Sequence, residues 1–305
     1  MKNKVVNVVA SVQAKLKNKA DESGRPFQEF LQYYGMERFI YRLSKTVYAN
    51  EFVLKGGLMF YSLGVSMRRP TRDIDYLGSS VSAQEDIYSV THEVLSSPVA
   101  DDGIVFNVDT LKVVETQIDG ERNGIRITFI GYIGKIKIPM QVDVGFFDEI
   151  ATTVLDIDYP VLLPNMEKPH IKGYPLESII SEKLHAMVRF AELNSRWKDY
   201  YDIWLLSNTF DFESQKLKEA IKITFKKRNT KLPATIPYGL TNDFATANQK
   251  NWKLFLRKSK LHNEDLEDFK TIAENIWNFL KYPLQELAVD MPTHNKHWKP
   301  GKDWV

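Results

Sequence analysis

Residues 52–77 read FVLKGGLMFYSLGVSMRRPTRDIDYL, and the rest of the chain is interpreted outward from this stretch. It opens with an apolar strand, Phe52–Leu54, which runs into Lys55 and then into the pair Gly56 and Gly57. Glycine tolerates backbone conformations that other residues avoid, so a strand can turn sharply into a helix at such a pair. The turn would leave backbone N–H groups exposed at the start of the helix.

A second strand follows this helix, which we expect over residues 58–63 with Gly64 as its C-cap, and the strand carries Asp73 and Asp75. Side chains two residues apart in a strand leave the same face, so the two carboxylates lie together. Such carboxylates hold divalent cations that bridge nucleotide phosphates, and exposed backbone N–H groups suit phosphate oxygens. The combination favours metal-assisted phosphoryl transfer, although either half alone is usually an ordinary turn or a solvated strand end.

The composition is that of an ordinary soluble protein, long enough at 305 residues for two domains or one elaborated domain. The chain has no cysteine, which excludes disulfides, thiolate metal sites and cysteine nucleophiles and fits a reducing cytoplasm. Its net charge of +2 is nearly balanced, so any nucleic-acid surface would be a local patch. No stretch approaches the roughly 18 apolar residues that span a bilayer, and the first residues lack a signal-peptide pattern, so we expect a cytoplasmic protein without a membrane partner.

Two amphipathic helices are expected before the glycine turn. Apolar residues at helical spacing predict the first over residues 5–20. The second, over residues 27–47, would carry Arg38 and Arg42 on a solvated face and could be broken near Gly35.

A helix and then a β-meander are expected between residues 82 and 144. The capping box formed by Ser82 and Glu85 predicts the start of the helix. Apolar alternation and turn residues predict the meander, with strands at residues 113–118, 125–130 and 136–144 and a turn at Asp119 and Gly120.

Asp143 is the third candidate carboxylate. Val142 and Val144 flank it and leave the opposite face of the strand, so an adjacent strand would bring Asp143 within reach of Asp73 and Asp75. The alternative is that Asp143 only caps the end of its strand.

A strongly periodic helix follows a proline-punctuated connection over residues 160–175. Lys183 lies off the buried stripe of this helix, and its compact charge could neutralise a phosphate. Asp199 follows in a polar stretch that opens another helix. The alternatives are that Lys183 pairs with Glu182 or Glu177 on a wet helix face and that Asp199 complements a helix dipole.

These motifs, in this order, resemble the signature of the AbiEii/AbiGii (MenT-type) nucleotidyltransferase toxins, a branch of the polymerase-beta-like nucleotidyltransferases. The similarity is carried by Lys55-Gly56-Gly57, Gly64, Arg69 and Thr71-Arg72-Asp73-Ile74-Asp75, and it extends from the first helices to about Ser207. Leu58 departs from the family pattern, because many relatives carry Ser or Thr directly after the glycine pair. Backbone amides and basic side chains would then contact the phosphates without a hydroxyl.

The motif order and the strand pattern predict an α/β fold. We expect N-terminal helices over residues 1–49, a small mixed-sheet nucleotidyltransferase core over 50–165, and a mainly helical C-terminal region over 166–305 that completes the active site. The family resemblance implies that Lys183 contacts the triphosphate and that Asp199 lies in the active site. It also implies the toxin of a toxin–antitoxin or phage-defence system, with a separately encoded antitoxin. The acceptor implied is the 3′ end of tRNA in some members, and a protein acceptor stays open as the alternative.

The resulting hypothesis is nucleotidyl transfer that depends on an NTP and on Mg²⁺ or Mn²⁺. Asp73 and Asp75 would bind the ion that holds the triphosphate, and Asp143 would join them at a second ion that activates an acceptor hydroxyl. The hydroxyl would attack the α-phosphate and expel pyrophosphate. The phosphate charge would be offset by Lys55, Gly56, Gly57, Arg72 and Lys183.

Three other functions stay open at this point. A glycosyltransferase also binds a metal and a sugar nucleotide through Asp-x-Asp, but would not need the glycine turn. A haloacid-dehalogenase-like phosphatase has a long apolar strand before its Asp-x-Asp, whereas residues 68–72 read RRPTR here. A non-catalytic RNA-binding module could use basic helix faces, namely Lys218, Lys222 and Lys226, and a second group of lysines and arginines around Trp252 and Phe255.

Overall fold

The computed structural model describes residues 7–64, 71–78, 84–118, 122–146, 153–261, 266–289 and 295–305. The chain forms two compact units, one from Met1–Asp148 with Leu155–Gly173 and the other from Glu149–Val154 with Tyr174–Val305. None of the described helices combines the length and the apolar composition that crossing a membrane requires.

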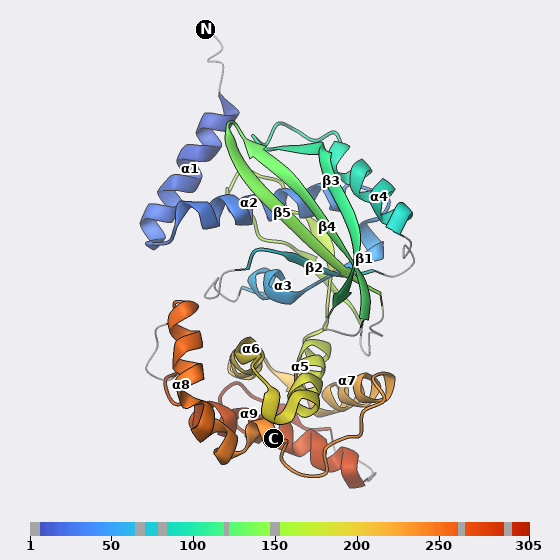
Figure 1. The fold of residues 1–305 in the computed structure, drawn as a ribbon, viewed down its shortest axis with the longest axis vertical. Coiled ribbons are helices and arrows are strands. Elements are labelled where there is room, and N and C mark those ends of the chain that lie inside the picture. The colour runs from blue at the N-terminus through green and yellow to red at the C-terminus, as the bar shows by residue number, and fades with distance from the viewer. Residues whose placement is uncertain are drawn as a thin grey trace. The chain divides into compact units, whose positions relative to one another are not determined.

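The first unit contains a seven-stranded mixed sheet with helices packed on it (Figure 1). Its elements are α1 (Val8–Ser23), α2 (Phe27–Ser44), η1 (Ala49–Glu51), β1 (Phe52–Lys55), α3 (Gly56–Ser62), β2 (Ile74–Gly78), α4 (Gln84–Ser96), β3 (Val105–Ile118), β4 (Arg122–Ile133), β5 (Ile136–Gly145), β6 (Leu155–Asp158) and β7 (His170–Gly173). The strand order is β3-β4-β5-β2-β1-β7-β6. The pairs β5–β2 and β1–β7 are parallel and the other neighbours are antiparallel, which confirms the α/β mixed-sheet prediction.

The three meander strands form where they were predicted and are longer than expected. The capping residue Ser82 and the turn at Asp119 and Gly120 lie outside the described residues, as does the side chain of Glu85. Strands β6 and β7 were missed: β7 lies inside the connection expected over residues 160–175, and β6 lies just before it. Each has only four residues, two of them charged or histidine on the solvent face, so neither gives a clear apolar run.

Helix α1 begins three residues later than the predicted start at residue 5, and residues before 7 lie outside the described part. The Asn7 side chain accepts the Ala10 N–H, and this cap explains the start of the helix. The helix ends at Gly24, whose φ of +66° is the left-handed conformation that favours glycine at a helix terminus.

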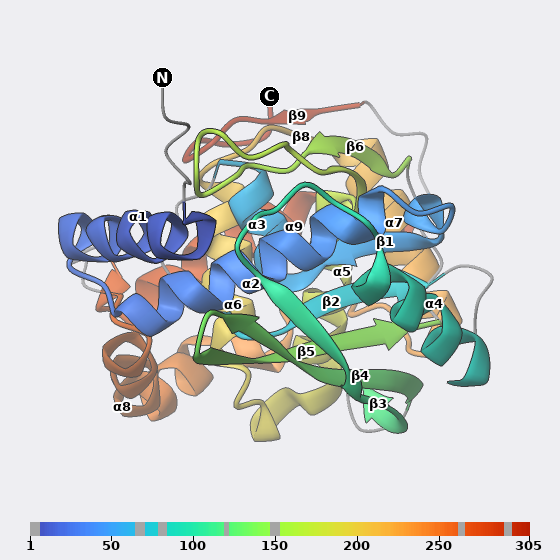
Figure 2. The same cartoon turned by 90° about the horizontal axis from the view of Figure 1, so that it is seen from above.

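Helix α2 runs unbroken through Gly35, so the predicted break there is wrong. The helix crosses one face of the sheet and contacts β5 and β7 (Figure 2). A Cβ atom at Gly35 would lie 2.9 Å from the Met140 sulfur of β5. Gly35 therefore allows the helix to approach the sheet closely, and it does not end the helix.

The arginines of α2 are buried, so the prediction of a solvated face for Arg38 and Arg42 is also wrong. Arg42 donates to both carboxylate oxygens of Asp102, at 2.8 and 3.1 Å, and to the Ile104 carbonyl at 3.2 Å. Arg38 donates to the Glu167 carbonyl at 3.2 Å. Arg42 thus binds the loop that leads into β3, and Arg38 binds the loop that leads into β7. These contacts explain why both charges are buried where an amphipathic pattern expects solvent.

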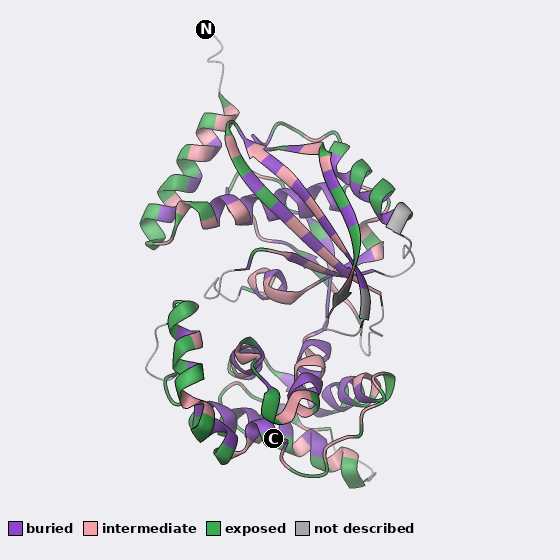
Figure 3. Cartoon of the chain, in the orientation of Figure 1, coloured by how far each residue is buried: buried purple, intermediate pink, exposed green. Residues whose placement is uncertain are grey.

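The second unit is mainly helical, as predicted. It comprises α5 (Leu176–Phe190), η2 (Ala191–Leu193), α6 (Trp197–Ser207), β8 (Phe212–Glu213), α7 (Ser214–Lys227), η3 (Tyr238–Leu240), α8 (Asn242–Lys258), α9 (Phe269–Val289) and β9 (His297–Trp298). Helix α9 contacts α6, α7 and α8, and Figure 3 shows buried residues along the faces that these helices turn toward one another.

The described tail after residue 295 docks on the second unit. Strand β9 pairs with β8, and the Trp298 indole donates to the Ser207 carbonyl at 2.7 Å. The Trp304 indole donates to the Phe279 carbonyl at 2.9 Å and its ring stacks on Phe279. The tail thus fills part of the apolar core of the unit, a role that its polar sequence left open.

Glu37 of α2 is the most unusual charged group in the core of the first unit. Its side chain is 2% exposed, lies 2.7 Å from the Arg38 guanidinium and accepts the Leu162 N–H at 2.6 Å. Burial outweighs the attraction of Arg38 and the Leu162 hydrogen bond and raises the pKa of Glu37 from 4.5 to about 7. Glu37 therefore changes protonation inside the core at near-neutral pH.

We expect Glu37→Gln to reduce the pH dependence of folding stability. A raised pKa in the folded state contributes stability that is complete below pH 4.5 and is lost as the pH rises through about 7. From below pH 4.5 to above pH 7, the wild-type free energy of unfolding should fall by roughly 3 kcal/mol more than that of Glu37→Gln. Denaturant titrations followed by circular dichroism measure this difference, and the exposed Glu93→Gln serves as control. Parallel profiles for wild type and Glu37→Gln would refute the assignment.

Candidate functional site

Four charged residues form a row across the central strands of the first unit. The register sets Lys55 of β1 opposite Asp75 of β2, Asp75 beside Asp143 of β5, and Asp143 opposite Arg126 of β4. Partners in register on adjacent strands point to the same face of the sheet. Two carboxylates therefore lie side by side, with a basic residue at each end of the row.

Asp73 completes a cluster of three carboxylates. It lies one residue before β2, on the same face as Asp75, and ligand atoms of Asp73, Asp75 and Asp143 all lie within 4.8 Å of one another. The structure thus brings together the three acidic residues that the sequence singled out on separate segments. All three are half-buried and offer only oxygen atoms, the ligands that Mg²⁺ and Mn²⁺ prefer, so the residues present fit such an ion.

The glycine pair lies directly beside this cluster. Gly56 begins α3 with a φ of +67°, and a Cβ atom there would overlap the Asp75 carboxylate. A Cβ atom at Gly57 would lie 3.1 Å from the Thr71 Cβ. Gly56 is therefore required both by backbone conformation and by the position of Asp75.

Thr71 and Tyr33 hold the Asp73 carboxylate in place. The Thr71 hydroxyl donates to Asp73 Oδ1 at 3.0 Å, and the Thr71 backbone N–H donates to the Tyr33 hydroxyl at 3.2 Å. Tyr33 belongs to α2, so the helix that crosses the sheet also orients the start of β2.

Arg126 and Gln141 are the site residues that the sequence interpretation missed. The Arg126 guanidinium donates to both oxygens of Asp143, at 2.8 Å each, and the Gln141 amide donates to Asp143 Oδ2 at 3.1 Å. The hydrogen bonds from Arg126 to Asp143 raise the pKa of Arg126, and the charges of Asp73 and Asp75 act in the same direction. One signal was available, since the two-residue turn after Ile133 sets Arg126 opposite Asp143.

The remaining predicted phosphate contacts differ in exposure. Lys55 is half-buried and precedes α3 directly, next to Asp75 in the sheet register. Arg72 is exposed, and its carbonyl accepts the Gln32 amide at 3.3 Å. Leu58, at the position where relatives carry a hydroxyl, is 1% exposed and belongs to the core.

Lys183 and Asp199 meet in a buried ion cluster of the second unit. Lys183 Nζ lies 2.7 Å from Asp199 and 2.8 Å from Asp202, and Arg196 lies 2.6 Å from the other Asp199 oxygen. The alternative partners Glu182 and Glu177 for Lys183 are therefore wrong. The positive charges of Lys183 and Arg196 balance the two carboxylates within the cluster. A role of Lys183 at a triphosphate stays a prediction.

Lys183 and Asp199 hold their charges over a wide pH range. Burial disfavours the Asp199 carboxylate, but the charges of Lys183 and Arg196 outweigh it and lower its pKa to about 2. Burial likewise opposes the Lys183 ammonium, and Asp199 and Asp202 outweigh it and raise the pKa of Lys183. Within the described residues, two of the three Lys183 donors bond to carboxylates, which leaves one N–H for another acceptor.

Two of the proposed basic surfaces need correction. Lys218 of α7 is buried and pairs with Glu286 at 2.6 Å, so the predicted face with Lys222 and Lys226 is interrupted. Trp252 of α8 is fully buried and stacks on Phe269, so it cannot stack on a base. Exposed basic residues do line α8 and its end, namely Lys250, Lys253, Arg257, Lys258 and Lys260.

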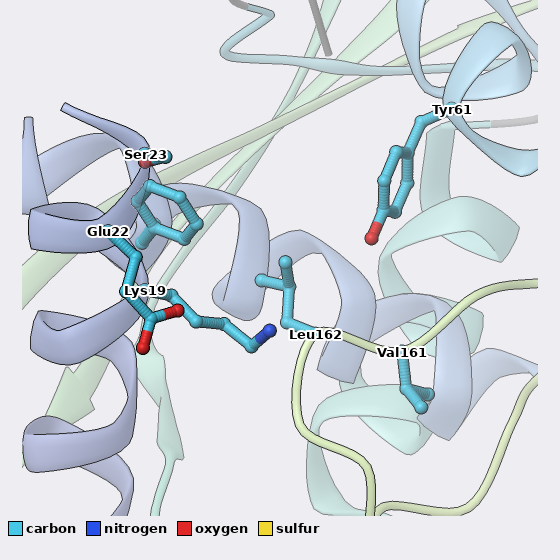
Figure 4. A pocket seen from close by; sticks show the side chains of 7 residues that line it. Lys19, Glu22, Ser23, Tyr61, Val161 and Leu162 are labelled. Atoms are coloured by element: carbon cyan, nitrogen blue, oxygen red, sulfur yellow. The ribbon is translucent and has the colours of Figure 1, made fainter. Parts of the chain in front are cut away.

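An open pocket of about 330 Å³ lies elsewhere on the first unit (Figure 4). Figure 4 shows the Lys19 amine and the Tyr61 hydroxyl directed toward the space beside Leu162. The lining residues are Lys19, Glu22, Ser23, Phe30, Tyr61, Val161 and Leu162. This set shares no member with the candidate site, so the pocket is not the place where the carboxylates meet.

Comparison with known proteins gives a family match over most of the chain. Residues 38–275 match the sequence model of a family described as "Nucleotidyl transferase AbiEii toxin, Type IV TA system". No curated protein matches.

Two solved structures resemble the chain at low sequence identity. One is a candidate nucleotidyltransferase from H. pylori, with 16% identity, a TM-score of 0.46 and coverage of 88% of this chain and 99% of that one. The other is JHP933 from Helicobacter pylori, with 14% identity, a TM-score of 0.49 and coverage of 85% and 96%. Both TM-scores are low, so the family match alone carries the assignment.

Gly56→Ala should abolish divalent-cation binding, whereas Gly64→Ala should preserve it. Both glycines have positive φ, +67° and +77°, so each alanine costs roughly 1–2 kcal/mol of backbone strain. Only the alanine at Gly56 also displaces the Asp75 carboxylate, since at Gly64 no described atom lies within 4 Å of the new Cβ. Mn²⁺ titrations alongside thermal unfolding separate the two effects. Equal Mn²⁺ affinities in the two variants would contradict this role of Gly56.

Lys183→Met should destabilise the second unit by roughly 3–5 kcal/mol, the usual cost of removing one partner from a buried ion pair. The exposed Lys198→Met provides a matched control within about 0.5 kcal/mol of wild type. Tryptophan fluorescence during denaturation reports on this unit, because all six tryptophans lie between residues 197 and 304. If Lys183→Met were as stable as Lys198→Met, Lys183 would not stabilise the ion cluster, and its role would be to bind a ligand.

Proposed function

This chain belongs to the AbiEii nucleotidyl transferase toxin family, as its motifs indicated, and we propose that it transfers a nucleoside monophosphate from an NTP to an acceptor. The family description assigns the chain to a nucleotidyltransferase and toxin class. The NTP, the metal dependence and the acceptor are the finer parts of the proposal.

One observation carries the proposal: three carboxylates within 4.8 Å of one another, next to a glycine turn that opens a helix. A solvated strand end does not explain three acidic side chains that converge from two strands, because their mutual repulsion destabilises the folded state. A divalent cation would relieve this repulsion. Metal-assisted phosphoryl transfer is the chemistry that uses such a cluster beside a phosphate-binding turn.

We assign roles to residues of the first unit on this basis. Asp73, Asp75 and Asp143 would hold Mg²⁺ or Mn²⁺, which when bound polarises phosphate oxygens and lowers the pKa of a hydroxyl. Lys55 and Arg72, with the Gly56 and Gly57 amides, would bind and orient the triphosphate. The acceptor hydroxyl would form a bond to the α-phosphorus, and pyrophosphate would leave.

We further propose, on the family resemblance, that Lys183 contacts the triphosphate and that Asp199 belongs to the active site. The free N–H of Lys183 would contact a phosphate oxygen, and Asp199 would orient the lysine through their 2.7 Å ion pair. The neutral balance of the ion cluster means that Lys183 would position the phosphate more than it would neutralise the charge.

We further propose the tRNA 3′ end as acceptor, a cytoplasmic reaction, and a separately encoded antitoxin. The exposed basic residues of α8 offer a surface that an RNA backbone fits, since phosphate neutralisation by lysine and arginine drives such binding. The same surface favours the second candidate function, a non-catalytic RNA-binding module. Such a module would gain nothing from the acidic cluster, so we rank transfer first.

Purified protein incubated with bulk tRNA, Mg²⁺ and each α-³²P-labelled NTP in turn should label tRNA with at least one nucleotide. Asp75→Ala should reduce labelling by roughly a hundredfold or more, because it removes a ligand from the centre of the cluster. Asp109→Ala, which removes an exposed carboxylate from β3, should label as wild type does.

The outcomes separate the candidate functions. Absence of label with every NTP, together with tRNA binding that is unchanged in Asp75→Ala, would support the RNA-binding module. Turnover of a sugar nucleotide in place of an NTP would support the glycosyltransferase alternative.

A further inference from the structure

Asp143 accepts three side-chain hydrogen bonds, two from Arg126 and one from Gln141. Oδ1 accepts the Arg126 Nε donor at 2.8 Å. Oδ2 accepts a second Arg126 nitrogen at 2.8 Å and the Gln141 amide at 3.1 Å. The register of β4 with β5 and the two-residue spacing within β5 place both partners on the face that carries Asp143.

These hydrogen bonds leave little of Asp143 open to a cation. An ionised carboxylate offers about four acceptor positions, two on each oxygen. The Arg126 fork and Gln141 occupy one position on Oδ1 and both positions on Oδ2. Counting donors from the described residues, a single position on Oδ1 remains, so Asp143 can ligate a metal ion through one oxygen only.

Stability does not explain the Arg126–Asp143 pair. The Arg126 side chain is 42% exposed and Asp143 is 12% exposed, and an ion pair with one partner this open to solvent contributes roughly 1 kcal/mol or less to folding. Backbone pairing of β4 with β5 already fixes both strands. The two parallel hydrogen bonds instead orient the Asp143 carboxylate, since a guanidinium binds both oxygens of a carboxylate in one plane.

We propose that Arg126 and Gln141 are positioning residues that restrict Asp143 to one metal-ligand oxygen and so select small octahedral cations over Ca²⁺. The inference rests on the metal role of the cluster in the proposed function. Ca²⁺ favours bidentate carboxylates and flexible coordination, whereas Mg²⁺ and Mn²⁺ accept single oxygens in a compact shell. The charge of Arg126 also lowers the affinity of the cluster for either cation, because like charges repel.

The test measures Mn²⁺ and Ca²⁺ affinities of the full-length, nucleotide-free protein by isothermal titration calorimetry. Arg126→Lys keeps the charge but loses the fork, so the Ca²⁺ affinity relative to Mn²⁺ should rise by roughly tenfold. Arg126→Met loses the fork and also removes the charge. We therefore expect the Mn²⁺ and Ca²⁺ affinities each to be roughly tenfold higher in Arg126→Met than in Arg126→Lys. Lys137→Met removes an exposed charge from the same strand, six residues from Asp143, and should change neither value.

Gln141→Leu provides a second route that leaves every charge in place. It frees one position on Oδ2, so the relative Ca²⁺ affinity should shift in the same direction as in Arg126→Lys and by less. Circular dichroism confirms that each variant is folded. An unchanged Ca²⁺ to Mn²⁺ ratio in Arg126→Lys and Gln141→Leu would overturn the proposal.

The result is distinguishable from failure of the proposed function. Wild-type protein that binds neither cation would overturn this inference directly. Wild-type protein that binds Mn²⁺ with the expected selectivity but labels no acceptor would leave the inference standing and refute the transfer reaction.

Discussion

The parallel pairing of β2 with β5 is the constraint on which the candidate site depends. It sets Asp75 beside Asp143 at one strand spacing, about 4.8 Å, where like charges repel. Apolar residues on the opposite face of the same strands supply the compensating energy, because Ile74, Val142 and Val144 are at most 1% exposed. The core thus holds in place a cluster that would separate if its strands were free, and the Arg126 guanidinium offsets part of the repulsion at Asp143.

Much of the fold follows from local patterns in the sequence. The meander, the helix after the glycine turn and the helical second unit all show a clear period of two or of 3.6 residues. Local patterns failed where tertiary contacts decide. Gly35 is accepted inside a helix because Met140 packs against it, and Arg38 and Arg42 are buried because loop oxygens distant in sequence receive their hydrogen bonds. No window of a few residues contains that information.

The candidate site shows the same division. Asp73 and Asp75 share a short motif, and the alternation around Asp143 gave its face, so their convergence was predictable. The partner of Asp143 was predictable in principle: the tight turn after Ile133 fixes the hairpin register, and counting seven residues back along each strand reaches Arg126. The sharing of Lys183 by two aspartates was not, because helix crossing, rather than spacing along one helix, sets that contact.

The docked tail has a consequence for the order in which the chain can fold during synthesis. The sheet of the first unit is complete once β7 has been made, so that unit can form while later segments are still being translated. The second unit must wait, because Trp304 closes its apolar core against Phe279, 25 residues earlier. Until then its helices expose aromatic surface, and a ribosome that stalls before residue 298 would release a chain with one finished unit and one open to chaperones and proteases.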